Sequence, residues 1–514
     1  MLAKINSYAL NGLEGYGVTV EVDIHAGIPN FDVVGLPDTA IKESRERVRS
    51  AVKNSGYDFS PRRITVNLAP AYTKKEGPTF DLAIALGILV STEQAGMDEN
   101  NKPLPSIRDY VFLGELSLSG EVTRINGVMP MLIAAREHGV KKIVIPKANS
   151  NEAKYICGID VYAVGTLRDA VSLINGETRE PIEKSDVVLG GIGRACEDLK
   201  FVKGQFAAKR ALEIAAAGGH NILMIGSPGG GKTMLAKCLP GILPDLTEQE
   251  ALETTKIHSV AGILDAERGI VTSRPFRSPH HTTSRVALTG GGSSAKPGEI
   301  SFSHNGVLFL DELPEYPRSV LEILRQPLED GVVTVSRAAR SVEYPANFML
   351  VASMNPCPCG YYGSTTHTCS CSPSQIQKYM SRISGPLLDR IDLHIEVDEV
   401  NYDDLTKDVQ TESSAQVKAR VNAARAIQTT RYAGTGVYSN AKMTSEMIKK
   451  YCALDAAGEK ILQAAFDRLG MSARAYTRIL KVARTIADLD GQERILSRHV
   501  AEAVMYRSLD KAVK

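Results

Sequence analysis

The sequence predicts an α/β protein whose last part is entirely helical. In residues 1–177, runs such as Val18–Ala26 and Arg63–Pro70 alternate apolar and polar positions, as half-buried strands do. Between residues 194 and 400, apolar runs and helical stretches alternate around Gly-rich and Pro-rich turns. This alternation is typical of a parallel sheet with helices on both faces. Residues 401–514 show only helical periodicity, which predicts an all-α lid domain.

Individual elements can be assigned within this frame. In the first region, Asp81–Val90 is apolar enough for a buried helix, and Lys141–Pro146 has the pattern of a further strand. Residues 178–193 are charged and then Gly-rich without a period, so we expect a linker there. The last region predicts about four helices. They fall in Ser413–Arg431, Ser445–Leu469, Ala473–Asp490 and Ser497–Arg507.

Composition excludes several classes of protein. The chain has 514 residues with a net charge of +1, which argues against a broadly basic nucleic-acid coat or a polybasic membrane binder. Its 8 cysteines do not form a secreted disulfide framework. No apolar run approaches the roughly 20 residues that span a bilayer. The first residues lack the pattern of a signal peptide. We therefore expect a cytoplasmic protein that does not enter a membrane.

The segment Gly226–Thr233 matches the phosphate-binding P-loop pattern G-x-x-x-x-G-K-[ST]. An apolar strand, Asn221–Gly226, precedes it, and a helix begins at Met234. Backbone N–H groups of the loop would surround the phosphates of ATP, Lys232 would reach the β- and γ-phosphates, and Thr233 would bind Mg²⁺. The nucleotide-binding residues are therefore Gly226, Ser227, Pro228, Gly229, Gly230, Gly231, Lys232 and Thr233. The alternative is a Gly-rich turn that happens to contain Lys-Thr.

Two later strands end in polar residues suited to ATP hydrolysis. The strand beginning at Gly306 ends in Asp311, which would bind Mg²⁺, and Glu312, which would polarise the attacking water as general base. The strand beginning at Phe348 ends in Asn355, which can hold that water against the γ-phosphate. Without the P-loop, an acidic strand-to-turn pair and an Asn-Pro turn would explain both patterns.

At this point the sequence resembles a known family. GSPGGGKT, RPFRSPHHTTS, PGEISFSHNGVLFLDELPE, SMNPCPCGYYG, SGPLLDRIDLHIEV and SARAYTRILKVARTIADL resemble the magnesium-chelatase-like AAA+ ATPases. Within that class the chain is similar to the bacterial ComM/YifB group over nearly its whole length. The resemblance implies a ring-shaped ATPase, a hexamer. It also implies that Asn355 is the first sensor residue and that Gln205 lies near the nucleotide.

The resemblance also implies roles for two arginines. Arg390 matches the arginine finger, which would reach the ATP of the neighbouring subunit, and Arg474 matches the second sensor arginine on the helical lid. Both would neutralise charge that develops on the γ-phosphate during hydrolysis. An alternative for Arg390 is a salt bridge to Asp389 or Asp392.

Members of this clade carry two hairpin insertions that line the pore of the ring. We expect the first around His258–Val271 and the second at Val332–Phe348, with Arg337 and Arg340 at its tip. Basic tips in a pore would bind DNA phosphates without reading sequence. The alternative is a solvated hairpin whose arginines have no ligand.

The first 177 residues resemble a Lon-protease-type domain. Lys74–Leu89 is similar to the segment that carries the serine nucleophile of that family, and Ser119–Pro146 to the segment that carries its lysine base. Thr79 stands at the serine position and Met129 at the lysine position. Because methionine cannot accept the hydroxyl proton, we expect a non-catalytic platform for DNA or ring assembly. A neighbouring lysine acting as base is the alternative.

A cluster of cysteines follows Asn355 in the spacing C-x-C-x9-C-x-C. Its members are Cys357, Cys359, Cys369 and Cys371. Four thiolates on one loop suit tetrahedral Zn²⁺, with His367 as a spare ligand. Reduced loop cysteines or a redox pair are the alternatives. The remaining cysteines have the scatter of packing residues: Cys157, Cys196, Cys238 and Cys452. For His280 and His281 we expect a structural or intersubunit role rather than a metal site.

These features predict an ATP-dependent DNA motor. The resemblance implies a helicase that promotes branch migration in recombination or natural transformation, with single-stranded or branched DNA as partner. Basic residues of the first C-terminal helix add support or form a solvated face. They are Lys418, Arg420, Arg425 and Arg431. The alternatives are a protein remodeller of the magnesium-chelatase subunit type, an ATP-dependent protease, and a chaperone, whose pore loops usually carry an aromatic residue.

Overall fold

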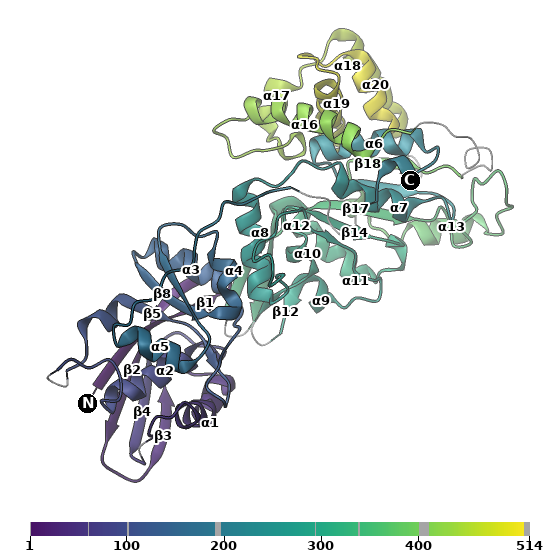
Figure 1. The fold of residues 1–514 in the computed structure, drawn as a ribbon. Helices are drawn as coiled ribbons and strands as arrows, with labels where there is room; N and C mark the ends of the chain where they lie inside the picture. The colour runs from purple at the N-terminus through teal and green to yellow at the C-terminus, as the bar shows by residue number, and fades with distance from the viewer. Residues whose placement is uncertain are drawn as a thin grey trace.

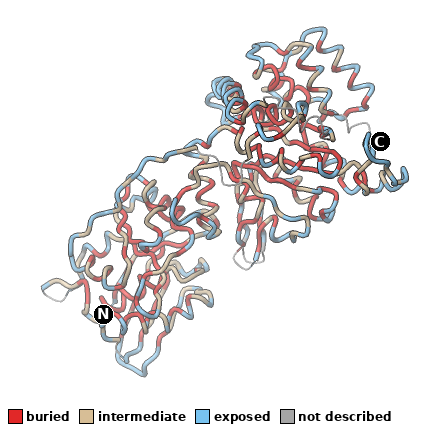
Figure 2. Tube along the Cα trace, turned by 45° about the vertical axis from the view of Figure 1, so that its right-hand side comes forward, coloured by how far each residue is buried: buried red, intermediate tan, exposed pale blue. Residues whose placement is uncertain are grey.

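The computed structural model describes most of the chain as two bodies joined end to end (Figure 1). The described residues are 2–59, 61–99, 102–190, 197–292, 295–337, 340–399 and 411–507, with only the backbone at Pro105, Arg337 and Arg340. Buried chain fills the interior of each body, so each has its own core (Figure 2). We call residues 2–190 the N-terminal body and residues 197–507 the C-terminal body.

The N-terminal body contains a seven-stranded sheet. In sheet order its strands are β3 (Asn30–Val34), β4 (Arg63–Ala69), β2 (Glu14–His25), β1 (Leu2–Asn11), β5 (Tyr110–Phe112), β8 (Lys142–Pro146) and β9 (Asp160–Val164). Strand β2 runs antiparallel to β1 and β4, and the other paired strands are parallel. The strands expected at Val18–Ala26, Arg63–Pro70 and Lys141–Pro146 are confirmed as β2, β4 and β8.

Helices cover both faces of this sheet. One buried cluster contains α1 (Thr39–Asn54), α2 (Asp81–Ser91) and α5 (Leu167–Ile174), and another contains α3 (Val128–Glu137) and α4 (Ser150–Ala153). Every residue of α2 is buried, as its continuous apolar run predicts.

The C-terminal body is built on a five-stranded parallel sheet. In sheet order its strands are β11 (Phe276–Arg277), β14 (Val307–Leu310), β17 (Met349–Met354), β10 (Ile222–Ile225) and β18 (Leu393–Glu396). In register, Ile225 at the end of β10 lies beside Met354 at the end of β17. Because the strands are parallel, the P-loop, Asp311 and Asn355 all follow carboxyl ends at one edge of the sheet.

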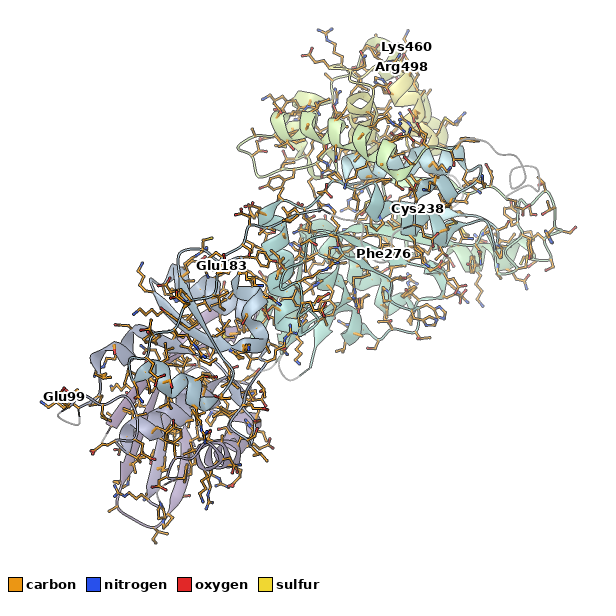
Figure 3. All side chains as sticks on the ribbon, in the orientation of Figure 1. Glu99, Glu183, Cys238, Phe276, Lys460 and Arg498 are labelled. Carbon is orange, nitrogen blue, oxygen red and sulfur yellow. The ribbon has the colours of Figure 1, made fainter. Side chains whose placement is uncertain are left out.

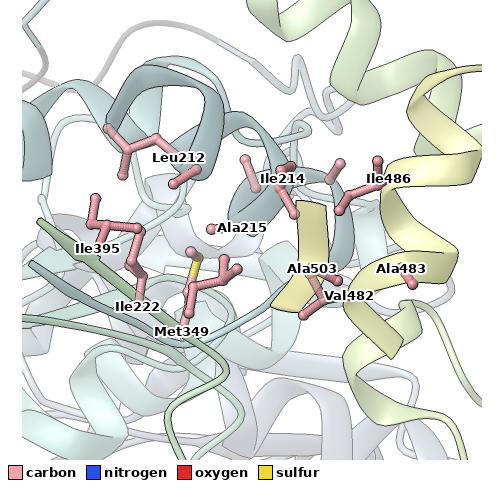
Figure 4. Close-up of a cluster of buried hydrophobic side chains, with 14 of the residues drawn as sticks. Leu212, Ile214, Ala215, Ile222, Met349, Ile395, Val482, Ala483, Ile486 and Ala503 are labelled. Atoms are coloured by element: carbon pink, nitrogen blue, oxygen red, sulfur yellow. The ribbon is translucent and has the colours of Figure 1, made fainter. Parts of the chain in front are cut away.

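A helical layer covers one face of this sheet. Its main helices are α6 (Phe206–Gly218), α16 (Ser414–Arg431), α17 (Ser445–Tyr451), α18 (Ala456–Leu469), α19 (Ala473–Leu489) and α20 (Ser497–Met505). Figure 4 shows α6 between the strands and the C-terminal helices, with Ile222 and Met349 on one side and Val482 and Ile486 on the other. Burial of this apolar seam holds the helical layer to the sheet.

One expected helix is divided in two. The segment Ser445–Leu469 forms α17 and α18 rather than a single helix. The side chain of Asp455 accepts a hydrogen bond from the Gly458 N–H at 2.6 Å and caps the N-terminus of α18. The preceding Leu454 forms a β-bridge with Ile495, which interrupts the helical path.

The first hairpin insertion does not lie at His258–Val271, where the family resemblance placed it. Helix α8 (Glu248–Ala261) runs through His258, and the chain after it packs on the N-terminal body. A short hairpin does precede β14, at β12 (Gly290–Gly291) and β13 (Lys296–Pro297). The capping box at Thr247 and the left-handed C-cap Gly262 explain why α8 continues through His258.

The second hairpin is present where it was expected. It consists of β15 (Val332–Arg337) and β16 (Arg340–Pro345), with Arg337 opposite Arg340 at the end of the ladder. The tip, 338–339, and the two arginine side chains lie outside the described residues. The Tyr344 hydroxyl donates to the Ala295 carbonyl at 2.9 Å, so this hairpin lies beside the β12–β13 hairpin.

The segment expected as a linker is hydrogen-bonded first to the N-terminal body and then to the C-terminal body. Ile182 N–H donates to Val161 O at 2.7 Å, and Gly190 N–H donates to Thr272 O at 3.2 Å. Glu183 lies on the N-terminal body, on its side towards the C-terminal body (Figure 3). Residues 191–193 of this segment lie outside the described residues. Across the described parts of the chain, no helix has both the length and the apolar character needed to cross a membrane.

Candidate nucleotide site

The P-loop connects β10 to α7 (Lys232–Cys238) and leaves its glycines open to a ligand. Gly229 and Gly231 have φ values of +80° and +86°, and a Cβ atom on either would have no atom of the described residues within 4 Å. Their left-handed backbone, not crowding, therefore requires glycine. The loop turns its backbone around a space that phosphate groups can fill.

Lys232 is buried within this loop. Its Nζ donates to Gly226 O at 2.7 Å, to Ser227 O at 2.9 Å and to Asn355 Oδ1 at 3.1 Å. Burial lowers the pKa of the Lys232 ammonium. The ammonium is thus held by three neutral oxygens, and these would be exchanged for phosphate oxygens when ATP binds.

Thr233 and Asp311 meet where Mg²⁺ is expected. Thr233 Oγ1 donates to Asp311 Oδ2 at 2.8 Å, and Ser353 Oγ donates to the other carboxylate oxygen. Adjacent ligands of an octahedral Mg²⁺ lie about 3 Å apart. The Thr233–Asp311 pair therefore has the spacing and the chemistry of two Mg²⁺ ligands.

Glu312 stands beside this pair in a strained backbone conformation. Its φ is +52°, which non-glycine residues rarely adopt and which is common at functional sites. Its side chain is 54% exposed, and Glu312 Oε2 lies 3.4 Å from His281 Nδ1. His281 also lies against His280, with 4.0 Å between ring centroids. The two histidines thus lie at the nucleotide site, a position that their sequence context did not indicate.

A cleft of about 1250 Å³ opens next to the P-loop. Gln205, with φ of +56°, borders it and donates from Nε2 to Asp398 O at 2.6 Å and to Gly230 O at 3.3 Å. Glu399 also borders it and was not identified from the sequence, since no motif marks it. Hydrogen bonds from Ser364, Thr366 and Ser227 lower the pKa of the Glu399 carboxyl to about 2. The cleft is large enough for the base and ribose of a nucleotide.

The arginines expected as finger and second sensor lie near one acidic side chain. Arg390 is 7% exposed and forms an ion pair with Glu329, while its Nη1 donates to Pro386 O at 2.8 Å. The predicted alternative partner Asp392 pairs instead with Arg478. Arg474 is exposed in the first turn of α19, and its charge, after that of Arg390, lowers the pKa of Glu329.

The four cysteines converge in the loop between β17 and α13 (Pro373–Met380). Their Sγ atoms lie within 4.8 Å of one another: 3.3 Å for Cys357–Cys359, 3.7 Å for Cys357–Cys369 and 3.6 Å for Cys359–Cys369. A tetrahedral Zn²⁺ with Zn–S bonds of about 2.3 Å separates its sulfurs by about 3.8 Å, whereas a disulfide needs about 2.0 Å. The arrangement therefore fits a metal ion and not a disulfide.

His367 is not needed as a ligand in this arrangement. Its ring stacks on Tyr361 at 4.6 Å, and its Nδ1 lies 2.8 Å from Thr366 Oγ1. Backbone hydrogen bonds from Tyr361 and Ser370 lower the pKa of Cys359 to about 5, whereas desolvation and the neighbouring sulfurs raise the pKa of Cys369 and of Cys371. Of the other cysteines, Cys238 and Cys452 are buried, Cys157 is exposed, and Cys196 lies outside the described residues.

The basic residues of α16 all bind partners within the chain. Lys418 pairs with Asp245 at 2.7 Å, and Arg420 pairs with Glu213 and with Glu412. Arg425 donates to the carbonyls of Ala216 and Tyr438, and Arg431 pairs with Asp488 at 2.5 Å. These bonds hold α16 in the helical layer, so the four side chains lend no support to DNA binding.

In the N-terminal body, Thr79 and Met129 lie in separate structural settings. Thr79 belongs to a short 3₁₀ turn (Pro78–Phe80), and its carbonyl accepts from the Gly114 N–H. Met129 is fully buried in the first turn of α3. Lys75, the neighbouring lysine, is buried and donates to Pro70 O, and burial lowers its pKa. The Lys75 ammonium is thus engaged by a backbone carbonyl and not by the Thr79 hydroxyl.

The sheet order, the P-loop and the polar residues at one sheet edge define the class of this protein: it has the fold of a P-loop ATPase of the AAA+ type. Comparison with known proteins identifies the family. Residues 198–405 match the family model described as magnesium chelatase, subunit ChlI; residues 20–149 match that of subunit ChlI of Mg-chelatase; and residues 411–507 match that of its C-terminal region.

Relatives match this chain almost from end to end. It is 44% identical over 515 aligned residues to competence protein ComM of Haemophilus influenzae, covering 99% of this chain and 98% of the relative. It is 42% identical over 513 residues to YifB of Escherichia coli, with the same coverage. The chain therefore belongs to the ComM/YifB family of magnesium-chelatase-like AAA+ proteins. A partial similarity, 29% identity over 196 residues, links it to Lon protease 2 of Bacillus subtilis, covering 33% of this chain and 34% of that protein.

Proposed function

We propose that this protein is an ATP-driven, ring-forming DNA motor that promotes branch migration in recombination or natural transformation. The observation that carries the proposal is the β15–β16 hairpin, which bears Arg337 and Arg340 at the end of its ladder and lies beside the β12–β13 hairpin. Two adjacent hairpins on one subunit suit a pore that binds the DNA backbone. The 44% identity to a competence protein supports the same function.

In this proposal ATP is the substrate and Mg²⁺ its partner ion. Thr233 and Asp311 would hold the Mg²⁺, and a bound Mg²⁺ would supply positive charge that offsets the negative charge of the phosphates. Lys232 exchanges its carbonyl partners for phosphate oxygens. Glu312 accepts the proton of the attacking water, and Asn355 orients that water. Gln205 and the P-loop residues 226–231 surround the rest of the nucleotide.

The four cysteines bind a structural Zn²⁺ in this account. Their sulfur separations fit a tetrahedral ion, and four thiolates would hold such an ion without a position for a substrate. Zinc would then have no direct part in hydrolysis.

The active form is proposed to be a homo-oligomeric ring, a hexamer, in the cytoplasm. Arg390 and Arg474 both act on Glu329, and in the ring this surface would face the ATP of the neighbouring subunit. Arg390 would exchange Glu329 for the γ-phosphate, so that hydrolysis depends on assembly. The N-terminal body serves as a non-catalytic platform, since Met129 cannot act as a base.

A second candidate is a protein remodeller of the magnesium-chelatase subunit type with no DNA role. The match of all three family models to subunit ChlI favours it. It would use the same ATP site, so only the response to a partner separates the two candidates.

Strand exchange on a branched DNA substrate tests the proposal. The wild-type chain with ATP and Mg²⁺ is expected to convert a fluorescently labelled three-strand junction to products. Glu312→Gln should bind ATP but lower turnover by about 10²- to 10⁴-fold, because it removes the general base. Glu446→Gln, on the distant helix α17, serves as a control for loss of one surface carboxylate. Hydrolysis without any strand movement would favour the protein remodeller.

A further inference from the structure

The loop that carries the four cysteines lies directly against the P-loop. A Cβ atom on Gly360 would lie 2.7 Å from Cγ and Cδ of Pro228, and Gly360 has φ of +89°. The close approach and the left-handed backbone each require glycine at this position. The two loops are therefore in direct contact, with the backbone of one against the proline ring of the other.

A carboxylate joins the same two loops a second time. One oxygen of Glu399 accepts from Ser227 Oγ at 2.9 Å, and the other accepts from Thr366 Oγ1 at 2.6 Å. Thr366 precedes Cys369 by three positions, and Ser227 belongs to the P-loop. A third contact lies at the start of the cysteine loop, where Asn355 Oδ1 accepts from Lys232 Nζ two positions before Cys357.

The middle of the cysteine loop also forms one wall of the nucleotide cleft. Residues 362–365 face the cleft from this loop, and residues 203–207 border it as well. In the described structure, residues 358–372 form neither helix nor strand. The two cysteine pairs lie at the two ends of this segment, and their sulfurs converge. This convergence closes the segment into a loop of defined shape. A cross-link of this kind reduces the conformational freedom of the segment it closes.

We propose that a zinc ion bound by the four cysteines holds this wall against the P-loop, so that the affinity of the protein for ATP depends on the metal. The inference rests on the ATP and zinc sites proposed above, and it does not depend on DNA. Without the ion the four sulfurs lose their common partner and the loop opens. Pro228 then loses its packing against Gly360, and Ser227 loses the Glu399–Thr366 bridge that positions it.

The test compares nucleotide binding by the full-length chain with and without its metal. Zinc content is measured by mass spectrometry, and the Kd of a fluorescent, non-hydrolysable ATP analogue is measured by anisotropy. The metal is removed with a mercurial reagent and a chelator, and a thiol then removes the mercurial. Loss of the metal should raise Kd about tenfold, as expected for loss of one or two hydrogen bonds. Added Zn²⁺ should restore it. Absence of bound zinc, or an unchanged Kd after its removal, would overturn the inference.

Two variants test the contacts without touching the cysteines. Thr366→Val removes the hydroxyl that bonds Glu399, and Gly360→Ala places a methyl group against Pro228. Both should retain zinc and bind the analogue several-fold more weakly. Gly434→Ala is the matched control, because Gly434 also has a left-handed backbone, with φ of +77°, but a Cβ atom there would have no described atom within 4 Å.

Wild-type affinity in both test variants would contradict the inference. A loss of affinity in Gly434→Ala as large as that in Gly360→Ala would also contradict it, because the effect would then come from backbone strain and not from the contact with Pro228. None of these readouts uses DNA, so failure of the DNA-motor proposal would leave them unaffected.

Discussion

Lys232 and Asn355 show how single residues prepare the site for ATP. The Lys232 ammonium is desolvated and bound by two loop carbonyls and the Asn355 side chain. A phosphate group is a stronger partner for a buried ammonium than a neutral carbonyl. Binding of ATP would therefore release Asn355 from Lys232 and free its amide to orient the attacking water.

The proposal that one nucleotide site is shared between subunits makes a prediction about Arg390. Arg390→Ala should lower ATP hydrolysis by about 10³-fold or more, because the transition-state charge loses its partner. Lys232→Ala should be inactive because it cannot bind phosphates. Mixing the two variants is expected to restore part of the activity, since some sites then receive Lys232 from one chain and Arg390 from the other.

Steady-state ATP hydrolysis over a range of mixing ratios measures this effect. Glu329→Gln is the control, because it removes the charge that pairs with Arg390 and leaves the guanidinium in place. If Arg390→Ala hydrolyses ATP at the wild-type rate, or if mixing restores nothing, Arg390 does not act across the subunit boundary.

Motif residues could be predicted from the sequence, and their supporting partners could not. Lys232, Thr233 and Asp311 belong to patterns with a fixed spacing, and the parallel sheet brings them together as expected. Glu399 reaches the same site from a segment without a motif, and His281 from a segment whose family resemblance implied no role at the nucleotide. Only the three-dimensional path of the chain reveals those contacts.

At the scale of elements, the strand β18 contains a buried histidine that makes stability depend on pH. Burial is the main cause that lowers the pKa of His394 from 6.5 to about 3, and the nearby positive charge of Arg507 adds to it. Below pH 6.5 the unfolded chain binds a proton at this residue that the folded protein does not bind. Stability should therefore fall as pH decreases from 6.5 towards 3, by about 1.4 kcal/mol per pH unit.

His394→Leu should remove this dependence while keeping a side chain of similar volume. Urea unfolding between pH 5 and pH 7 measures it: the wild-type free energy of unfolding should decline more steeply with acid than that of the variant. Equal slopes for the two proteins would show that His394 does not titrate differently in the folded and unfolded states.

Sequence patterns predicted most elements but not all of their boundaries. Strands such as β10 and β17 are short apolar runs before a turn signal, which makes them easy to assign. The break between α17 and α18 was missed because the segment was assigned to one helix, whereas Asp455 caps a new helix and Leu454 forms a bridge with Ile495, a residue distant in the sequence. The hairpin expected at His258–Val271 was misplaced because α8 continues through His258 to Ala261.

At the scale of the whole molecule, the N-terminal body contacts the part of the C-terminal body that carries the hairpins. Buried Glu152 accepts from the Ser259 hydroxyl of α8 at 2.6 Å, and the Gly127 N–H donates to the Ser259 carbonyl at 3.0 Å. A Cβ atom on Gly12, at the β1–β2 turn, would lie 2.4 Å from Val342 of β16. The N-terminal body thus contacts the DNA-binding hairpin proposed here at the Val335–Val342 pair, two residues from Arg340.

Sequence patterns could not predict this arrangement of the two bodies. The charged segment 178–193 was expected only as a linker, whereas its described residues are bonded to both bodies. The contacts at Ser259 and Val342 join residues more than one hundred positions apart, so no local pattern records them.

The most direct test of the central claim is the rate of ATP hydrolysis by the full-length chain with and without single-stranded and branched DNA. We expect DNA to stimulate the wild type. We expect Arg337→Ala with Arg340→Ala to lose the stimulation but keep basal hydrolysis, because in the proposed pore these arginines would bind the DNA and have no part in the nucleotide site. Lys460→Ala, on the distant helix α18, is the control for loss of surface charge and should respond as the wild type does. Hydrolysis that is indifferent to every DNA would contradict the account and direct attention to a protein partner.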